Sequence, residues 1–286
     1  MGRPVSTIRR LRLGLELRRM REQCGKSQIE AAEALDTSDT KVSRLEAGKT
    51  GLSRLELVAL LDLYEVSDTR LRDGLIELNR NSKQRGWWQQ HRDVLSTQLL
   101  ELIELESTAS SIFQYEALVM PGLLQTEAYA RAMISGFPLP PSTSIDDTVR
   151  VRLERQLLLA KEDAPSLLCL LDEAVLRRQV GGPKVMAEQL RRLVELNDPP
   201  HLTIQVIPFA RGAYPGLDGS FLRFLFSGAA DMDIVFLEQK ESRVFVEEAA
   251  SVETYRIAAE HLRSQALSSP ESMDLISAIA AEFDSM

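Results

Sequence analysis

The fold of the N-terminal part of this chain is decided by residues 17–46, which read LRRMREQCGKSQIEAAEALDTSDTKVSRLE. Apolar residues recur in this stretch at helical spacing, and the pattern is interrupted at Asp36-Thr37-Ser38. We expect two short helices, Gln28–Leu35 and Asp39–Leu45, on either side of this break. Asp36 suits the break because aspartate tolerates a left-handed backbone better than most residues do.

The second of these helices has two different faces. Val42 and Leu45 form an apolar face that would pack inward, and the opposite face is polar. Such an arrangement lets one helix enter a DNA major groove while the preceding helix braces it against the backbone. The stretch therefore predicts a helix-turn-helix motif. Its polar reading face consists of Asp39, Thr40, Ser43 and Arg44.

Capping residues mark the ends of the helices around this motif. Gly25 is placed to end the preceding helix, since glycine readily adopts the conformation of a helix C-cap. A serine at a helix start accepts a backbone hydrogen bond, and a glutamate three residues later completes a capping box. With a further helix over about 67–78, these signals predict an all-α domain of five helices in residues 1–79. The serine signals are Ser27 with Glu30, Ser38, and Ser53 with Glu56.

The composition is typical of a globular protein. With 286 residues, of which 44% are hydrophobic and 27% charged, the chain is long enough for two domains. No apolar run approaches the roughly 20 residues that span a bilayer, and the N-terminus lacks the apolar segment of a secretory signal. Cys24 and Cys169 are far apart in the sequence. We therefore expect a cytoplasmic protein with reduced thiols and no membrane association.

The net charge of −8 is distributed unevenly along the chain. Residues 1–90 hold 17 basic and 13 acidic side chains, a balance of +4, whereas residues 91–286 hold 17 basic and 29 acidic ones, a balance of −12. The first part is suited to attract phosphates and the second to repel them. We expect double-stranded DNA to bind the N-terminal domain.

Residues 13–78 resemble the Xre/Cro family of helix-turn-helix regulators from lambdoid phages and bacteria. The family pattern is a helix ending in R-x-x-x-G, followed by S-Q, A-x-x-L and S-x-x-x-[VI]-S-R-[LIV]-E-x-G. The turn departs from the family, which usually has Gly-Val where this chain has Asp36-Thr37. The matching residues are Arg21, Gly25, Ser27, Gln28, Ala32, Leu35, Ser38, Val42, Ser43, Arg44, Leu45, Glu46 and Gly48.

The resemblance implies roles for residues beside the reading helix. Gln28 would clamp a DNA phosphate, with a solvated surface glutamine as the alternative. Glu46 would form a structural ion pair with Arg21, because its family counterpart pairs with an arginine of the first helix. Contacts to the DNA backbone are also expected from Lys41, Lys49 and Thr50. The candidate DNA-binding residues are Gln28, Ser38, Asp39, Thr40, Lys41, Ser43, Arg44, Lys49 and Thr50.

Two residues of the reading helix have competing interpretations. Arg44 is suited to a guanine edge, where a bidentate pair is worth roughly 1–3 kcal/mol of discrimination; a phosphate contact and a free surface role are its alternatives. Asp39 repels phosphates, so its best DNA target would be a cytosine amino group. An acid at a helix N-terminus is equally favourable without any DNA, and both interpretations of Asp39 stay open.

A polar stretch after the fifth helix predicts a linker at residues 80–90. Trp87-Trp88 lie within it. Adjacent tryptophans can stack on bases, but at a domain boundary they more often anchor packing, and we favour the packing role.

Residues 91–286 predict an α+β domain with a mixed or antiparallel sheet. The prediction depends on several strand-like runs close together near the end of the chain, surrounded by helical patterns. Strands are expected over 166–171, 202–209, 220–226, 233–238 and 243–247. Helices are expected over 95–107, 146–160, 183–196, 251–267 and 271–283, with a further helix that contains Tyr129-Ala130-Arg131.

The second domain carries a second resemblance, to an actinobacterial family of regulators. Those proteins join an Xre-type reader to a long C-terminal domain described as antitoxin-like, and a small partner protein is their frequent neighbour. The resemblance implies a transcriptional regulator whose second domain senses a partner protein or a small-molecule effector. Its motifs are PGLLQT-x-x-YAR at 121–131, VRLERQ at 151–156, LDEAVLRR at 171–178, Gly181-Gly182, QL at 189–190, QVIPF at 205–209 and the strand entry at 219–221.

Enzyme signatures are weak in this sequence. There is no zinc-ligand spacing and no phosphate-binding loop of the Walker type, so we expect no catalytic residues, no metal and no cofactor. Residues 181–184, GGPK, could cradle an anion, but a plain turn with proline in the first helical turn is favoured. Asp233 with Glu238 and Lys240 could bind Mg²⁺ as in metal-dependent nucleases, and this is the strongest enzymatic alternative.

The chain is therefore predicted to be a sequence-specific transcriptional regulator. It would be a homodimer that reads inverted-repeat operators with the helix at 39–45 and is regulated through its C-terminal domain. The alternative is an antitoxin-like interaction module that binds a small partner protein and autoregulates its own operon.

Overall fold

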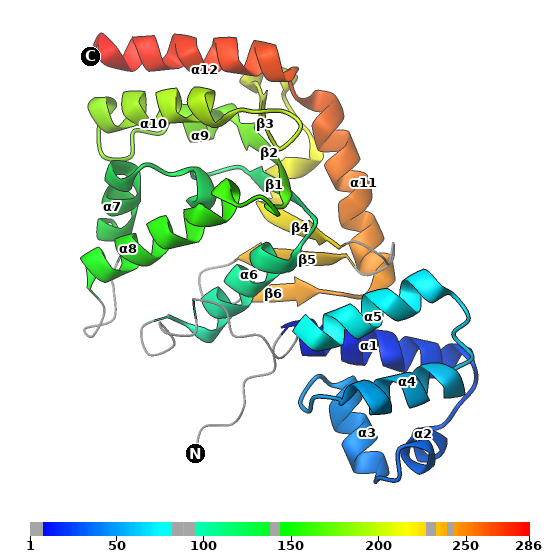
Figure 1. Cartoon of the computed structure of the whole chain (residues 1–286). Coiled ribbons are helices and arrows are strands. Elements are labelled where there is room, and N and C mark those ends of the chain that lie inside the picture. The colour runs from blue at the N-terminus through cyan, green and yellow to red at the C-terminus, as the bar shows by residue number, and fades with distance from the viewer. Residues whose placement is uncertain (1–7, 82–87, 89–94, 138–143, 227–232, 239–242) are drawn as a thin grey trace. The chain divides into compact units, whose positions relative to one another are not determined.

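Figure 1 shows the computed structural model of the chain, which describes residues 8–81, 88, 95–137, 144–226, 233–238 and 243–286. The chain divides into two compact units, and the division falls after Leu105, inside helix α6 (Thr97–Thr108). The first unit comprises the residues up to Leu105 and the segment that starts at Phe226. The second comprises Glu106–Leu225 and Asp233–Met286.

The first unit contains the five helices that the sequence predicts. They are α1 (Ile8–Gln23), α2 (Gln28–Ala34), α3 (Asp39–Glu46), α4 (Arg54–Leu63) and α5 (Thr69–Asn81). One apolar core joins all five, and Leu17, Ala31, Val42, Leu57 and Leu75 are among its buried members.

The capping signals act as the sequence predicts. Gly25, with φ of +70°, follows the end of α1, and both predicted capping boxes are formed, at the start of α2 and of α4. Ser38 caps α3 by accepting a hydrogen bond from the Lys41 amide. Asp36 has φ of +48°, so the turn between α2 and α3 contains the left-handed aspartate expected there. The limits of the helix-turn-helix motif are thus set by local interactions.

The contact between α1 and α3 depends on Gly14. A Cβ atom at this position would lie 2.4 Å from the carbonyl oxygen of Leu45 and 2.6 Å from that of Glu46. Only glycine allows the two backbones to approach so closely. Gly14 is not among the residues predicted above to shape the fold, although a glycine inside a helical pattern is a signal of close packing.

Of the predicted linker, the structure describes residues 80, 81 and 88. Arg80 and Asn81 continue α5, whereas Trp87 lies outside the described residues. Trp88 is buried against Leu100 and Ile103, with Leu95 and Leu99 beside them. Trp88 therefore anchors packing on α6, as the sequence analysis favoured.

The second unit is built on a six-stranded mixed sheet. In space its strands follow the order β3-β2-β1-β4-β5-β6. Strands β1, β2 and β3 are parallel, whereas β4, β5 and β6 are antiparallel to their neighbours. The strands are β1 (Ser111–Glu116), β2 (Ser166–Asp172), β3 (Leu202–Ile207), β4 (Phe221–Leu225), β5 (Ile234–Glu238) and β6 (Arg243–Val246).

Strand β1 was missing from the sequence prediction. It is a central strand, paired with β2 in register Gln114↔Cys169 and with β4 in register Gln114↔Leu222. Its four middle residues are all buried, including the polar Gln114. A strand covered on both faces does not show the apolar–polar alternation that identifies a half-exposed strand.

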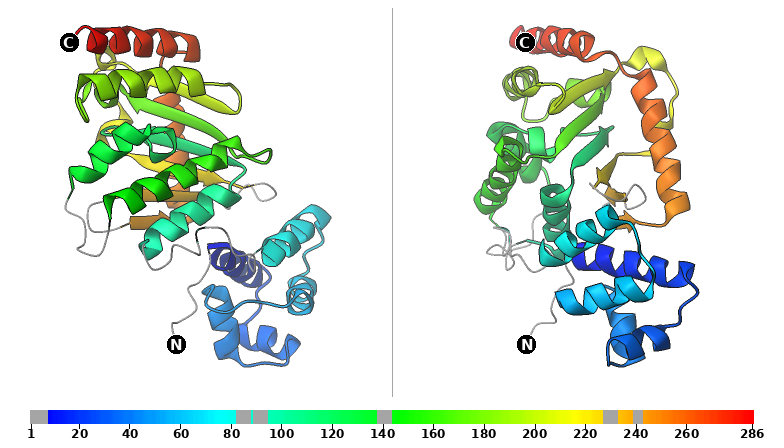
Figure 2. Two further views of the ribbon diagram at one scale, coloured as in Figure 1. Left: turned by 60° about the vertical axis from the view of Figure 1, so that its left-hand side comes forward. Right: turned by 45° about the vertical axis from the view of Figure 1, so that its right-hand side comes forward.

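Helices cover both faces of the sheet (Figure 2). Helix α11 lies on one face, where Ala259 and Leu262 join a core with Phe113 and Tyr115 of β1. Helices α7, α8 and α10 lie on the other face (Figures 1 and 2). Among the described residues, no helix has both the length and the apolar character that crossing a membrane requires. The helices are α7 (Glu127–Ser135), α8 (Ile145–Gln156), α9 (Glu173–Arg177), α10 (Pro183–Leu196), α11 (Ala249–Gln265) and α12 (Ser269–Asp284).

The outer edge of β3 is closed by side chains and a loop. Asn197 Oδ1 accepts from the Ile204 amide at 2.9 Å, and Ser272 Oγ accepts from the Val206 amide at 3.0 Å. The Val206 carbonyl accepts from the Leu267 amide at 2.8 Å. These bonds satisfy backbone groups at the sheet edge that could otherwise pair with a strand of another chain.

Candidate nucleic-acid interface

Helix α3 has the two faces that the sequence predicts. Val42 and Leu45 are buried in the core of the first unit, with exposed fractions of 1% and 3%. The opposite face is open to solvent, since Asp39, Thr40, Ser43 and Arg44 are all exposed. Lys49 is also exposed, and Thr50 is half-buried. An eight-residue helix thus presents a polar surface while its other side is anchored.

The N-terminus of α3 is organised by its own side chains. Ser38 Oγ accepts from the Lys41 amide at 3.3 Å. Asp39 Oδ1 accepts from the Thr40 amide at 2.6 Å and from Thr40 Oγ1 at 3.3 Å. Asp39 therefore interacts favourably with the helix end without DNA, as one of its two interpretations states.

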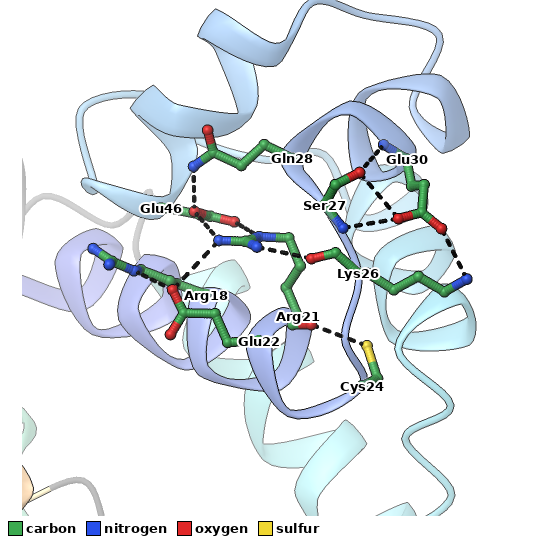
Figure 3. A network of polar contacts seen from close by, with 9 residues as sticks. All are labelled: Arg18, Arg21, Glu22, Cys24, Lys26, Ser27, Gln28, Glu30 and Glu46. Atoms are coloured by element: carbon green, nitrogen blue, oxygen red, sulfur yellow. Dashed lines mark hydrogen bonds and ion pairs between the residues drawn. The ribbon is translucent and has the colours of Figure 1, made fainter.

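The predicted ion pair between Arg21 and Glu46 is present (Figure 3). Arg21 Nε lies 2.5 Å from Glu46 Oε1, and Nη2 lies 3.1 Å from Oε2. Nη1 of the same arginine donates to the Lys26 carbonyl at 2.9 Å. Both side chains are buried, and the carboxylate raises the pKa of Arg21 through these hydrogen bonds. The pair fixes the end of α3 against α1.

Gln28 joins the same pair. Its Nε2 donates to Glu46 Oε2 at 2.8 Å, and its side-chain oxygen points away from Glu46 (Figure 3). The two expected roles of Gln28 are a phosphate clamp and a solvated surface side chain. The structure adds a third feature, an internal hydrogen bond that fixes the orientation of the amide. A phosphate contact by Gln28 stays a prediction.

Lys41 is held by an acid of the next helix. Its Nζ lies 2.7 Å from Glu56 Oε1, while Glu56 Oε2 accepts from the Ser53 amide at 2.7 Å. Together these interactions lower the pKa of Glu56 to about 2. The sequence marked Glu56 as a capping residue, but a contact across 15 positions is visible only in the tertiary structure.

The strongest enzymatic alternative is an Mg²⁺ site that includes Asp233 and Lys240. Asp233 pairs with Arg223 on β4, and Lys240 lies outside the described residues. Within the described ranges, no group of three or more His, Cys, Asp or Glu residues is placed to hold a metal ion.

The glycines at 181–182 have a packing role. A Cβ atom on Gly181, whose φ is +74°, would lie 2.9 Å from the Cβ atom of Ala132 in α7. Pro183 is the first residue of α10. The segment forms the turn that the sequence analysis favoured, and helix packing accounts for its composition.

The PGLLQT segment at 121–126 is held from neighbouring helices. Gln189 of α10 donates to the Leu124 carbonyl at 2.8 Å and accepts from the Thr126 amide at 2.7 Å. Gln156 of α8 donates to two carbonyls of the segment at 2.9 and 2.8 Å. These amide side chains satisfy backbone groups that the short 3-10 helix at Gly122–Leu124 and the residues around it leave without a helix or ladder partner. The motif is therefore a buried structural joint.

A buried ion pair lies beside that joint. Glu106 of α6 is fully buried and is bridged by Arg155 of α8, whose Nε donates at 2.5 Å. Burial raises the pKa of Glu106, and the arginine partly offsets this effect. The Arg155 guanidinium also packs against Gly122: a Cβ atom added to this glycine would lie 3.5 Å from Arg155 Nη1.

Comparison with known proteins matches two family models to separate parts of the chain. A family model described as a helix-turn-helix domain matches residues 12–73. No curated protein and no solved structure matches the chain. The N-terminal domain identifies a DNA-binding regulator. A second model, described as a domain of unknown function (DUF5753), matches residues 99–278, which is more than half of the chain. The chain therefore belongs to the DUF5753 family and carries a helix-turn-helix domain in front of its family domain.

Proposed function

We propose that this protein is a sequence-specific transcriptional regulator of the Xre type, which binds inverted-repeat operators as a homodimer. The observation that carries the proposal is the solvent-exposed polar face of α3, presented above a buried face and fixed by the Arg21–Glu46 ion pair. A reading helix must be held rigidly, since its side chains discriminate bases only in a defined geometry.

Arg44 is the proposed base reader. It is exposed in the last turn of α3 and has the fork of donors that matches a guanine edge. Ser38, Asp39, Thr40 and Ser43 would complete the reading face, with Gln28, Lys49 and Thr50 on the phosphate backbone.

The experiment is an affinity measurement on the full-length protein. A preferred duplex is first selected from random DNA, and fluorescence anisotropy then compares the wild type with Arg44→Ala. We expect a loss of about 1–3 kcal/mol on the preferred duplex and relaxed preference at one base pair of each half-site. Arg70→Ala, an exposed arginine of α5, is the control and should keep both quantities. Unchanged affinity and preference in Arg44→Ala would refute the proposed docking.

The second candidate function is an antitoxin-like interaction module that binds a small partner protein and autoregulates its operon. Three large apolar side chains in the loops after β1 and β3 support it, because exposed apolar residues often mark protein contacts. Leu118, Phe209 and Leu217 are 60%, 55% and 63% exposed. Co-purification of a stoichiometric small protein, lost in a triple serine variant of these residues, would favour it. Neither candidate includes a catalytic activity.

A further inference from the structure

The ion pair between Lys41 and Glu56 makes Lys41 different from the neighbouring cations Arg44 and Lys49. Lys41 lies in the first turn of α3, where a contact to the DNA backbone was expected. Its ammonium group is instead 2.7 Å from the Glu56 carboxylate. Arg44 and Lys49 are exposed. In the protein without DNA, the charge of Lys41 is therefore balanced by a carboxylate, whereas Arg44 and Lys49 are exposed to solvent.

The Glu56 carboxylate is held in place independently of Lys41. Its second oxygen accepts from the Ser53 amide at 2.7 Å, and Ser53 Oγ accepts from the Glu56 amide at 3.1 Å. An anion in the first turn of α4 is also favoured by the helix dipole. The acid therefore remains beside Lys41 as long as α4 keeps its start.

Such a pair changes the electrostatic attraction between α3 and the DNA phosphates. A lysine and a glutamate 2.7 Å apart have no net charge, so a phosphate gains little by approaching them. Side chains that are 37% and 26% exposed, as in this pair, contribute little to folding stability. The pair has a much larger effect on the attraction for phosphates, because every neutralised phosphate releases counterions.

We propose that Glu56 withholds the charge of Lys41 from the DNA backbone and thereby sets the sequence-independent part of the affinity for DNA. It lowers the attraction that is common to all DNA sequences and leaves the base-reading face of α3 unchanged. Discrimination between sequences is set by Arg44 and its polar neighbours and is independent of Glu56. This inference rests on the proposed function.

The test uses the full-length protein and Glu56→Gln. Glutamine also completes a capping box, so α4 should keep its start while Lys41 loses its anion. Affinity is measured against salt concentration on a preferred duplex and on random duplex of equal length. We expect the slope of log K against log salt to steepen by about 0.9. Across a fourfold salt range this adds a three- to fourfold loss of affinity on both duplexes, so the ratio of specific to non-specific affinity should stay unchanged.

The matched control is Asp62→Asn. This change also removes one negative charge from α4, at the other end of the helix, where Asp62 pairs with Arg72 of α5 at 2.7 Å. Its salt slope should equal that of the wild type. The double variant Lys41→Gln with Glu56→Gln should return to the wild-type slope. An unchanged or shallower slope in Glu56→Gln, or equal steepening in Asp62→Asn, would overturn the proposal.

A second measurement needs no DNA. The pKa of the Glu56 carboxyl, followed by NMR, should be near 2 and should rise in Lys41→Gln. A Glu56 that titrates in the ordinary range of glutamate would refute the ion pair itself. Wild-type protein that binds no DNA, with Glu56 still near 2, would instead refute the proposed function.

Discussion

Single residues join the three helices that carry the proposed DNA-reading surface. The Glu46 carboxylate, 5% exposed, accepts two hydrogen bonds from Arg21 of α1 and one from Gln28 of α2. Removing one partner of such a buried charge pair costs about 3–5 kcal/mol, since the remaining charge is left uncompensated. The pair thus couples the orientation of α3 to the fold of the whole unit.

A first prediction concerns Gly14. Replacing it with alanine places a methyl group within 2.6 Å of two backbone oxygens of α3, so α1 and α3 must separate. We expect a loss of about 1–3 kcal/mol in the free energy of unfolding, measured by urea denaturation. Gly74→Ala in α5 is the control, because its Cβ meets no atom within 4 Å; it should stabilise by about 0.5–1 kcal/mol. Equal effects of both changes would contradict the close contact.

A second prediction concerns the pH dependence of Glu116, at the end of β1. Burial raises its pKa to about 7, although Gln114 Nε2 donates to it at 2.8 Å. Between pH 4.5 and 7 the folded state binds more protons than the unfolded state at this group, so its contribution to stability falls as pH rises. Glu116→Gln should therefore match the wild type near pH 4.5 and exceed it by on the order of 3 kcal/mol at pH 8. Denaturation at both pH values checks this, with the exposed Glu188→Gln as control; a constant difference would contradict the raised pKa.

At the scale of elements, backbone groups that lack a partner in a strand ladder or helix are satisfied by side chains of neighbouring segments. The edge of β3 is satisfied from Asn197 and Ser272, and the PGLLQT segment is satisfied from α8 and α10. Because these donors and acceptors are buried, each must find a partner within the protein. This explains why glutamines, otherwise surface residues, occupy core positions in this unit.

A third prediction follows for Gln189. Leucine at this position leaves the Leu124 carbonyl and the Thr126 amide without their partner, and each buried unsatisfied group costs about 1–3 kcal/mol. We expect Gln189→Leu to lower the unfolding free energy by at least that amount, measured by chemical denaturation. Glu188→Leu, on the exposed side of α10, should change it by less than about 0.5 kcal/mol. Tolerance of Gln189→Leu would show that the segment is held by other contacts.

At the scale of the whole molecule, the N-terminal and C-terminal parts of the chain have opposite charge balances. Residues 1–90 carry an excess of four positive charges and residues 91–286 an excess of twelve negative ones. The second unit therefore has no electrostatic reason to contact DNA. Its proposed contribution is to bring two readers together, which raises the effective concentration of the second one.

The last prediction tests that contribution. Full-length protein should sediment as a dimer at micromolar concentration and bind an inverted repeat with half-sites roughly 34 Å apart far more tightly than a single half-site. Analytical ultracentrifugation and anisotropy on the two duplexes measure this. A monomer with equal affinity for both duplexes would refute the dimeric reader.

The sequence by itself determined the features that depend on near neighbours. Helix starts at Ser27, Ser38 and Ser53, the left-handed Asp36 and the apolar stripe of α3 all follow from residues within one or two turns. The Arg21–Glu46 pair was also anticipated, through resemblance to a known motif. Local backbone and capping preferences are strong enough to be recognised in the sequence alone, without knowledge of the tertiary structure.

Only the tertiary structure decided the features that join distant segments. The buried strand β1, the close approach at Gly14 and the contact of Lys41 with Glu56 involve partners on other elements. Burial on both faces removes the periodic signal of a strand, and a charged side chain takes whichever partner the packing of helices brings near. Such choices depend on three-dimensional distance, which sequence spacing does not encode.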